Sequence, residues 1–237
     1  MSQPFRSGHG FYRPSVCEGI TLELREDHIA LRSPEVVLAL SSAVYGGGFV
    51  YADSFINWKV PLTYNCSDPV KDLSFIMEQQ GYSLNSSVGL ITAANLTHAS
   101  IMETDGDRFS ILCCTTAGTT NAARAGLRRS FFPAYEAGTI NTFLFIDGRM
   151  TSSAMVNAVI TATEAKTAAL QDLGIMETMH GRLATGTTTD SIVIALSQSN
   201  RYDELHAYAG TATTIGDGIS RMVYETVHES VRTQNEG

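Results

Sequence analysis

The chain has 237 residues, of which 43% are hydrophobic and 17% charged, and its 24 acidic and 16 basic residues give a formal net charge of -8. This composition is typical of a globular protein with ample core material, and it lacks the basic excess that binding to a polynucleotide requires. The N-terminal residues contain no apolar signal, and the longest apolar runs are too short to cross a bilayer. We therefore expect a cytoplasmic protein without nucleic-acid or membrane contact, folded as one domain over residues 1–237; a homo-oligomer stays open.

The first 60 residues predict a β-hairpin followed by a glycine-rich bend. Residues 20–24 and 28–32 both alternate apolar with polar side chains across a short polar break, as two paired strands do. An apolar run at 36–40 then leads into the consecutive glycines Gly46, Gly47 and Gly48. Either a sharp bend or a close approach to a ligand would explain three residues without Cβ atoms.

The middle of the chain predicts one helix and two strands. With Ser67 as N-cap and Gly81 as the stop, the intervening residues form a helix whose apolar face holds Val70, Leu73, Ile76 and Met77. Residues 87–94 and 108–116 are expected to be strands, and the turn sequence TDGD precedes the second of them.

The second half predicts strands at 138–147 and 191–197 and helices at 152–174 and 218–232. The apolar faces expected for the two helices are, respectively, Met155, Val156, Val159, Ile160, Thr163 and Leu170, and Ile219, Met222, Val223, Val227 and Val231. The tail after the last helix is expected to fray. Strands and helices occur in both halves, so the fold class is mixed α/β or α+β, with β-sheets layered with helices.

The four cysteines Cys17, Cys66, Cys113 and Cys114 are expected to be free thiols in a reducing compartment. Adjacent strand residues point to opposite faces, so Cys113 and Cys114 cannot bind one metal ion together. A catalytic thiol would need a cationic neighbour, and the nearby sequence offers none. The isolated pair Glu225 and His228 is better explained as a helix surface than as a metal site, and we expect no metal.

Three turns at strand ends share one chemistry: residues 115–121 (TTAGTTN), 138–141 (GTIN) and 185–190 (TGTTTD). Glycine lets the backbone come close to a ligand, and threonine or asparagine adds hydrogen-bond donors, so the set could hold a polar group or an oxyanion. Ordinary turn and cap chemistry is the alternative, because the same residue types are favoured there. Among titratable residues nearby, Asp147, Glu164, Asp190, His98 and His180 are candidates for acid or base chemistry.

Four segments closely resemble the adenosylcobinamide amidohydrolases, the CbiZ family. They are TTAGTTNAARAG (115–126), GTINTFLFIDGRMTSSAMVNAVITATEAKTAALQDLGI (138–175), ATGTTTDSIVIA (184–195) and YAGTATTIGDGI (208–219). The resemblance runs from about Ser41 to Val231. It implies hydrolysis of the amide that joins the corrin ring's side chain to aminopropanol, which converts adenosylcobinamide to adenosylcobyric acid in corrinoid salvage. The corrinoid is then the substrate, no cofactor is expected, and the absent DxHxxG motif gives no histidine ligand for cobalt.

The resulting hypothesis assigns two sets of residues. The catalytic set is Asp190, Glu164, His180 and Thr116, in which Asp190 or Glu164 positions a water or hydroxyl and His180 protonates the leaving amine. The substrate-binding set is Gly46, Gly47, Gly48, Asn57, Thr119, Asn121, Arg124, Asn141, Thr188 and Thr189. Whether Arg124 and Arg128 contact substrate or a partner stays open.

A fainter resemblance, to the DmpA-type aminopeptidases and ornithine acetyltransferases, implies stacked sheets covered by helices. That group uses a Ser or Thr exposed by self-cleavage, and no counterpart of the cleavage site is evident here. An aminopeptidase or acyltransferase, and a corrinoid-binding protein without activity, are therefore the alternative functions.

Overall fold

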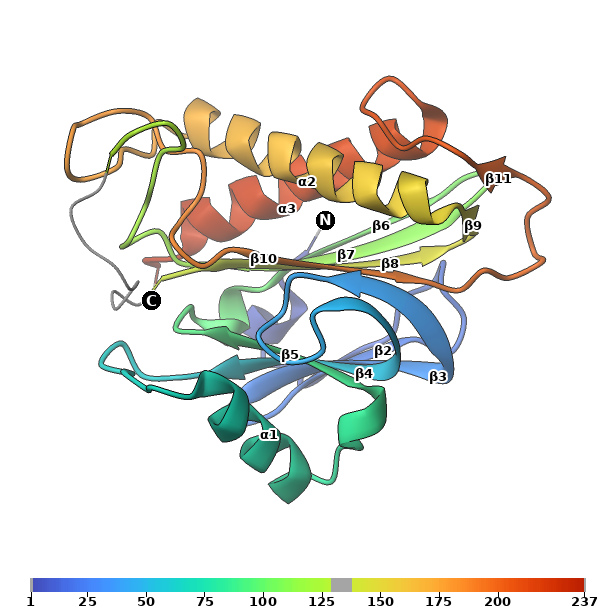
Figure 1. Ribbon diagram of the computed structural model, residues 1–237, viewed down its shortest axis with the longest axis horizontal. Helices are drawn as coiled ribbons and strands as arrows, with labels where there is room; N and C mark the ends of the chain where they lie inside the picture. Colours follow the sequence, from blue (N-terminus) through green and yellow to red (C-terminus); the bar gives the residue numbers. More distant parts are fainter. Residues whose placement is uncertain (1, 129–137, 237) are drawn as a thin grey trace.

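The computed structural model describes residues 2–128 and 138–236, which form four stacked layers (Figure 1). Two long helices, α2 (Ser152–Asp172) and α3 (Thr214–Thr233), form the first layer. Two layers of β-strands follow, and the shorter helix α1 (Pro69–Gln79) covers the far side. The predicted mixed fold, in which β-strands are layered with helices, is therefore confirmed.

Within the described residues nine strands are hydrogen-bonded into one curled sheet. Their bounds are β1 Phe11–Tyr12, β2 Thr21–Leu24, β3 His28–Ser41, β4 Gly48–Lys59, β5 Ser87–Thr92, β6 Ser100–Asp105, β7 Ser110–Ala117, β8 Ile140–Asp147 and β10 Ser191–Leu196. A small separate sheet pairs β9 (Arg149–Met150) with β11 (Leu205–His206), and single-turn helices lie at Pro4–Ser7, Leu84–Ser86 and Leu96–His98.

The layer beside α2 and α3 has the order β10, β8, β7, β6, with β10 and β8 parallel and the other pairs antiparallel. The register pairs Ser191 with Asn141 and Asn141 with Thr116. The last residues of β7 and the first residues of β8 and β10 therefore lie side by side at one end of the layer.

Strand β3 connects the two β layers because it is long enough to belong to both. Its first residues pair with β2 and its last residues with β10, while β4 pairs with both parts along the other side. The register with β4 shifts between Arg32 and Val37, and such a bulge bends the strand. Beyond β4, the parallel strand β5 completes the second layer.

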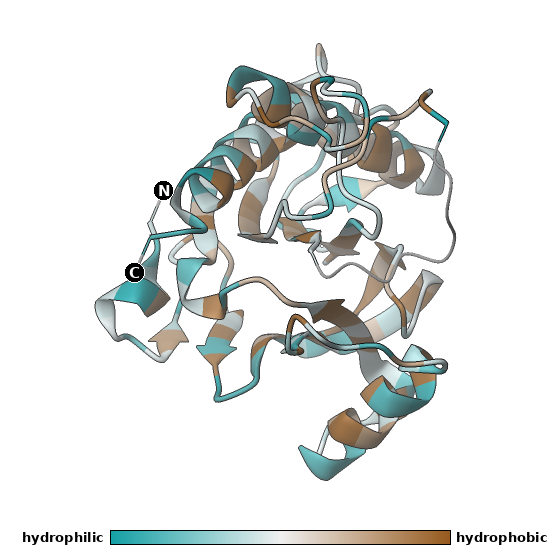
Figure 2. Cartoon of the chain, turned by 90° about the vertical axis from the view of Figure 1, so that its left-hand side faces the viewer, coloured by the Kyte–Doolittle hydropathy of each residue, from teal (hydrophilic) through white to brown (hydrophobic). Residues whose placement is uncertain are grey.

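Alternating side chains fill the spaces between the layers. In β7, Ile111 and Cys113 pack toward α2 and α3, and Leu112 and Cys114 pack between the two β layers. A third, smaller core lies between the second β layer and α1, where Leu73 and Met77 are fully buried. Viewed from the end, the apolar colouring concentrates between the layers (Figure 2). The predicted opposite orientation of the two adjacent cysteines is confirmed.

Most predicted elements are present, with shifted ends. The hairpin of β2 and β3, the helices and the strands β5, β7, β8 and β10 are confirmed. The N-cap of α1 is Asp68, whose carboxylate accepts from the Lys71 amide, so the prediction of Ser67 was wrong. Strand β3 continues through the separate apolar run at 36–40, and strands β4 and β6 were not predicted.

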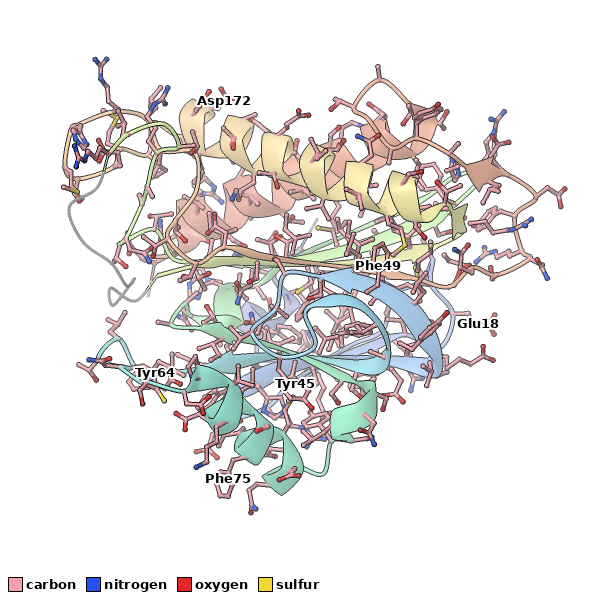
Figure 3. All side chains as sticks on the ribbon, viewed as in Figure 1. Glu18, Tyr45, Phe49, Tyr64, Phe75 and Asp172 are labelled. Carbon is pink, nitrogen blue, oxygen red and sulfur yellow. The ribbon has the colours of Figure 1, made fainter. Side chains whose placement is uncertain are left out.

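The predicted apolar face of α2 was partly wrong. Met155 and Leu170 are buried, but Val156 and Ile160 are about half exposed. The buried face is instead a row of alanines, Ala154, Ala158, Ala162, Ala165 and Ala169. Small side chains allow α2 to pack closely against α3 and the sheet, so volume rather than hydropathy decides which face is buried. On α1, Val70 and Phe75 also remain exposed, and Phe75 projects away from the sheets (Figure 3). The predicted face of α3 is buried throughout.

The start of α3 requires a glycine at position 216. A Cβ there would lie 2.0 Å from the carbonyl oxygen of Gly210 and 2.5 Å from that of Ala209, both backbone atoms. The Gly216 amide also donates to the N-cap Thr213 at 3.1 Å. We expect Gly216→Ala to lower the free energy of unfolding by about 2 kcal/mol or more, measured by urea denaturation. Gly10→Ala, where the nearest atom is 3.8 Å away, is the control, and equal midpoints for the two variants would contradict the close packing.

No helix within the described residues has the length and apolar content that crossing a membrane requires.

Candidate functional site

The three glycine- and threonine-rich turns of the sequence meet at the end of the sandwich that faces the viewer in Figure 2. Asn121 Nδ2 donates to Thr188 Oγ1 at 2.6 Å, which joins the first turn to the third. Thr139 Oγ1 donates to the carbonyl oxygen of Thr189 at 2.9 Å, which joins the second turn to the third. The structure therefore brings together the turns that sequence alone could only group by composition.

A buried chain of amide and hydroxyl groups connects the two β layers beneath these turns. Asn57 of β4 donates to Thr116 Oγ1 of β7 at 2.8 Å, and it accepts from Asn141 Nδ2 of β8 at 2.8 Å. Asn141 also donates to the carbonyl oxygen of Ile91 at 3.0 Å and accepts from Thr139 at 3.1 Å. Asn57, Thr116 and Asn141 are each at most 2% exposed. A buried polar group without a partner lowers the stability of the fold, so these hydrogen bonds fix the strand ends in the orientation that pairs every group.

Asp190 anchors the third turn through both carboxylate oxygens. Oδ1 accepts from the amide of Ile140 at 3.0 Å and from the Thr187 hydroxyl. Oδ2 accepts from the Thr187 amide at 2.9 Å and from Lys166 Nζ of α2. The four donors hold the first residue of β8, the turn and the helix in one arrangement. A carboxylate with this many partners is better suited to positioning than to abstracting a proton.

The C-terminal helix holds the first turn. Gln234 Oε1 accepts from the amide and from the hydroxyl of Thr119 at 2.9 and 3.1 Å. An ion pair of 2.8 Å between Arg6 and Glu236 ties the following residues to the N-terminal segment. The prediction that this tail frays was therefore wrong for residues up to 236, because both tail side chains have partners.

Two predicted catalytic residues lie away from the cluster around Asp190. Glu164 is exposed and lies on the face of α2 opposite Lys166, because two helical residues span about 200°. It lines a surface pocket of about 320 Å³ between α2 and α3, together with Arg221 and Tyr224. His180 is 39% exposed at the tip of a short hairpin, and its hydrogen bonds go to Glu177.

That hairpin is held by one buried carboxylate. Glu177 accepts from the amides of Met179, His180 and Arg182. Burial opposes ionisation of Glu177, but these amides outweigh it and hold the pKa of the carboxyl below its usual value. Arg124 donates to the carbonyl oxygen of Leu183 at 2.7 Å, so it is at least in part a structural tie to the hairpin.

The remaining candidates have structural partners. Gly46 has φ +70°, and its Cβ position would lie 2.9 Å from the carbonyl oxygen of Ser87, so the glycine bend is fitted against β5. Asp147 lies at the opposite end of β8 and accepts from Ser197 and Ser199. His98 is buried, and burial together with the nearby Arg6 charge lowers its pKa. The predicted substrate contacts of Gly46, Gly47 and Gly48 stay predictions.

The thiols and acidic groups offer little alternative chemistry. Burial raises the pKa of Cys113 to about 11 and raises that of Cys114 further, so neither forms a thiolate readily at neutral pH. In the described part of the chain, no three His, Cys, Asp or Glu side chains are grouped as metal ligands would be. His228 stacks on Tyr224 of the same helix.

Sequence reasoning missed three residues of the site. Gln234 carries no motif of its own, and Thr139 lies within the predicted turn 138–141 but was not singled out there. The roles of both depend on contacts across long sequence separations. Lys166 had a visible signal, because it interrupts the alanine row of α2 at helical spacing from Ala158 and Ala162. The predicted apolar face of α2 was placed elsewhere, so Lys166 was not included among the candidate residues.

Comparison with known proteins identifies the relatives of the chain. The family model described as adenosylcobinamide amidohydrolase (CbiZ) matches residues 14–237. The uncharacterized protein MJ1613 of Methanocaldococcus jannaschii is 35% identical over 164 residues, which cover 62% of this chain and 63% of that protein. The adenosylcobinamide amidohydrolase of Methanosarcina mazei is 28% identical over 196 residues, which cover 80% of this chain and 88% of that protein.

Among solved structures, the PH0078 protein of Pyrococcus horikoshii aligns with 95% of this chain and 81% of its own, at 12% identity and a TM-score of 0.40. The family assignment depends on the sequence match, which extends over nearly the whole chain and includes the three turns that meet at the sandwich end. The chain therefore belongs to the adenosylcobinamide amidohydrolase family.

Proposed function

We propose that this protein hydrolyses the amide between the corrin side chain and the aminopropanol arm of adenosylcobinamide, giving adenosylcobyric acid for corrinoid salvage. The observation that carries the proposal is the family match over residues 14–237, supported by the relative in Methanosarcina mazei that bears the amidohydrolase name. Water adds to the carbonyl carbon, the C–N bond breaks, and the leaving nitrogen takes up a proton. The chain must supply donors for the oxyanion and direct the attacking oxygen.

The end of the sandwich supplies suitable groups for binding an amide. Thr188 is exposed, and in the described residues its hydroxyl takes part only in the bond it accepts from Asn121. Its own proton is therefore available to a substrate oxygen. The bonds of Asn121 and Asp190 hold the turn that carries Thr188, so the hydroxyl needs little reorganisation on binding. We place the reacting amide beside Thr188 and Thr189.

The test is incubation of the purified protein with adenosylcobinamide, followed by mass spectrometry. We expect equimolar adenosylcobyric acid and aminopropanol, with one oxygen from labelled water in the new carboxyl group. Tight binding without either product would favour a corrinoid-binding protein instead. A denaturing gel should show one band at 25.6 kDa, because cleavage into two fragments ahead of a Ser or Thr would favour the aminopeptidase-like alternative.

A further inference from the structure

Lys166 is a charged residue on the buried side of a helix. Its side chain is 10% exposed, and it follows Ala158 and Ala162 along the row that packs α2 against the sheet. The other two lysines, Lys59 and Lys71, are both exposed. Burying an ammonium group is costly, so a specific partner is required at this position.

The partner is Asp190, whose side chain is also 10% exposed. In residues 2–128 and 138–236, no other group accepts a hydrogen bond from Lys166 Nζ. Gly186 leaves room for the pair, because a Cβ there would lie 2.5 Å from Asp190 Oδ2 and 2.9 Å from Lys166 Nζ. A glycine of the third turn, a turn carboxylate and a helix ammonium thus form one packed unit.

A buried ion pair contributes little net stability, because the desolvation of both charges offsets their attraction. Its effect here is to fix the orientation of the segments that Asp190 contacts. Through Asp190, the ammonium of α2 is coupled to the Thr187 amide in the third turn and to the Ile140 amide at the start of β8. These are the segments that carry Thr188 and Asn141.

We propose that Lys166 is a positioning residue of the amidohydrolase site, which acts through Asp190 to hold the turn 185–190 in the orientation that binds the substrate amide. The proposal rests on the proposed function for its kinetic consequence. Its structural consequence, a fixed turn, is independent of the substrate.

The test compares Lys166→Met with the double variant Lys166→Met/Asp190→Asn, and uses Lys71→Met as the matched control at an exposed helical lysine. Removing the lysine alone leaves a buried carboxylate uncompensated, and we expect Tm to fall by about 10 °C. The double variant removes both charges and should recover at least half of that loss. In both variants kcat/KM for adenosylcobinamide should be at least about tenfold below wild type, and Lys71→Met should change neither quantity.

Hydrogen exchange of the Thr187 and Ile140 amides gives a readout without substrate. We expect faster exchange at these amides in both Lys166 variants, including the double variant whose global stability has recovered. Recovery of kcat/KM together with Tm in the double variant would overturn the proposal, because the pair would then be only structural. Unchanged exchange at both amides would also overturn it. Absence of cleavage by the wild-type protein would instead overturn the proposed function, and the exchange result would still decide the positioning role.

Discussion

Asp190→Asn is expected to lower the rate of adenosylcobinamide cleavage at least about a hundredfold. The carboxylate accepts from two donors on each oxygen, and an asparagine has only one oxygen. In either orientation the NH2 group of the asparagine would face two donors, which then lose their acceptor. At the Oδ2 position these donors are the Thr187 amide and Lys166, and at the Oδ1 position they are the Ile140 amide and the Thr187 hydroxyl. Displacement of a substrate-binding turn by about 1 Å is enough for a loss of this size. Steady-state kinetics measures it.

Folding must be measured on the same sample, because an unpaired buried ammonium also destabilises the protein. Asp217→Asn is the control, since Asp217 is an exposed aspartate whose side chain pairs with Arg221 on the surface of α3. We expect the control to keep wild-type kinetics. A folded Asp190→Asn variant with near-normal turnover would remove Asp190 from the mechanism, both as an anchor and as a base.

The local chemistry of the site was visible in the sequence, but its assembly was not. The grouping of the three turns followed from their shared glycine, threonine and asparagine content, and Asn121 and Thr139 do contact the third turn. The sequence could not show that Asn57 belongs beside Asn141, because they lie 84 residues apart on different β layers. Nor could it show that all four acceptor positions of Asp190 are occupied.

The missed strands have a physical explanation. Strand β4 belongs to the second β layer, which is packed on both faces. Successive residues such as Phe55, Ile56 and Asn57 are therefore all buried. The alternation that marks a half-buried strand is therefore absent. Strand β6 pairs on one side with β7, and its sequence SIMETD changes from buried to exposed residues along its length. Helix α2 was misread because alanines, which carry little hydropathy signal, form its buried face.

Asn141→Asp is expected to cost more stability than any other same-sized change at the site. The amide donates to the Asn57 side chain and to the Ile91 carbonyl, and an ionised carboxylate can donate to neither. Two acceptors would then face a buried charge, which we expect to lower the free energy of unfolding by about 3 kcal/mol or more at pH 8. Asn200→Asp, at an exposed position, is the control and should change little.

The pH dependence of this variant distinguishes a buried charge from simple misfit. Burial and the two facing oxygens would raise the pKa of the new carboxyl in the folded protein above its unfolded value of about 3.9. Because the folded-state pKa is raised, protonation of the new carboxyl favours the folded state. Its stabilising effect on folding is present at low pH and is lost as pH rises through the folded-state pKa. The deficit relative to wild type should therefore grow between about pH 4 and pH 8 in urea denaturation. A deficit that stays constant over this range would show that the amide chain is open to water, and that the two β layers are joined there by packing rather than by paired polar groups.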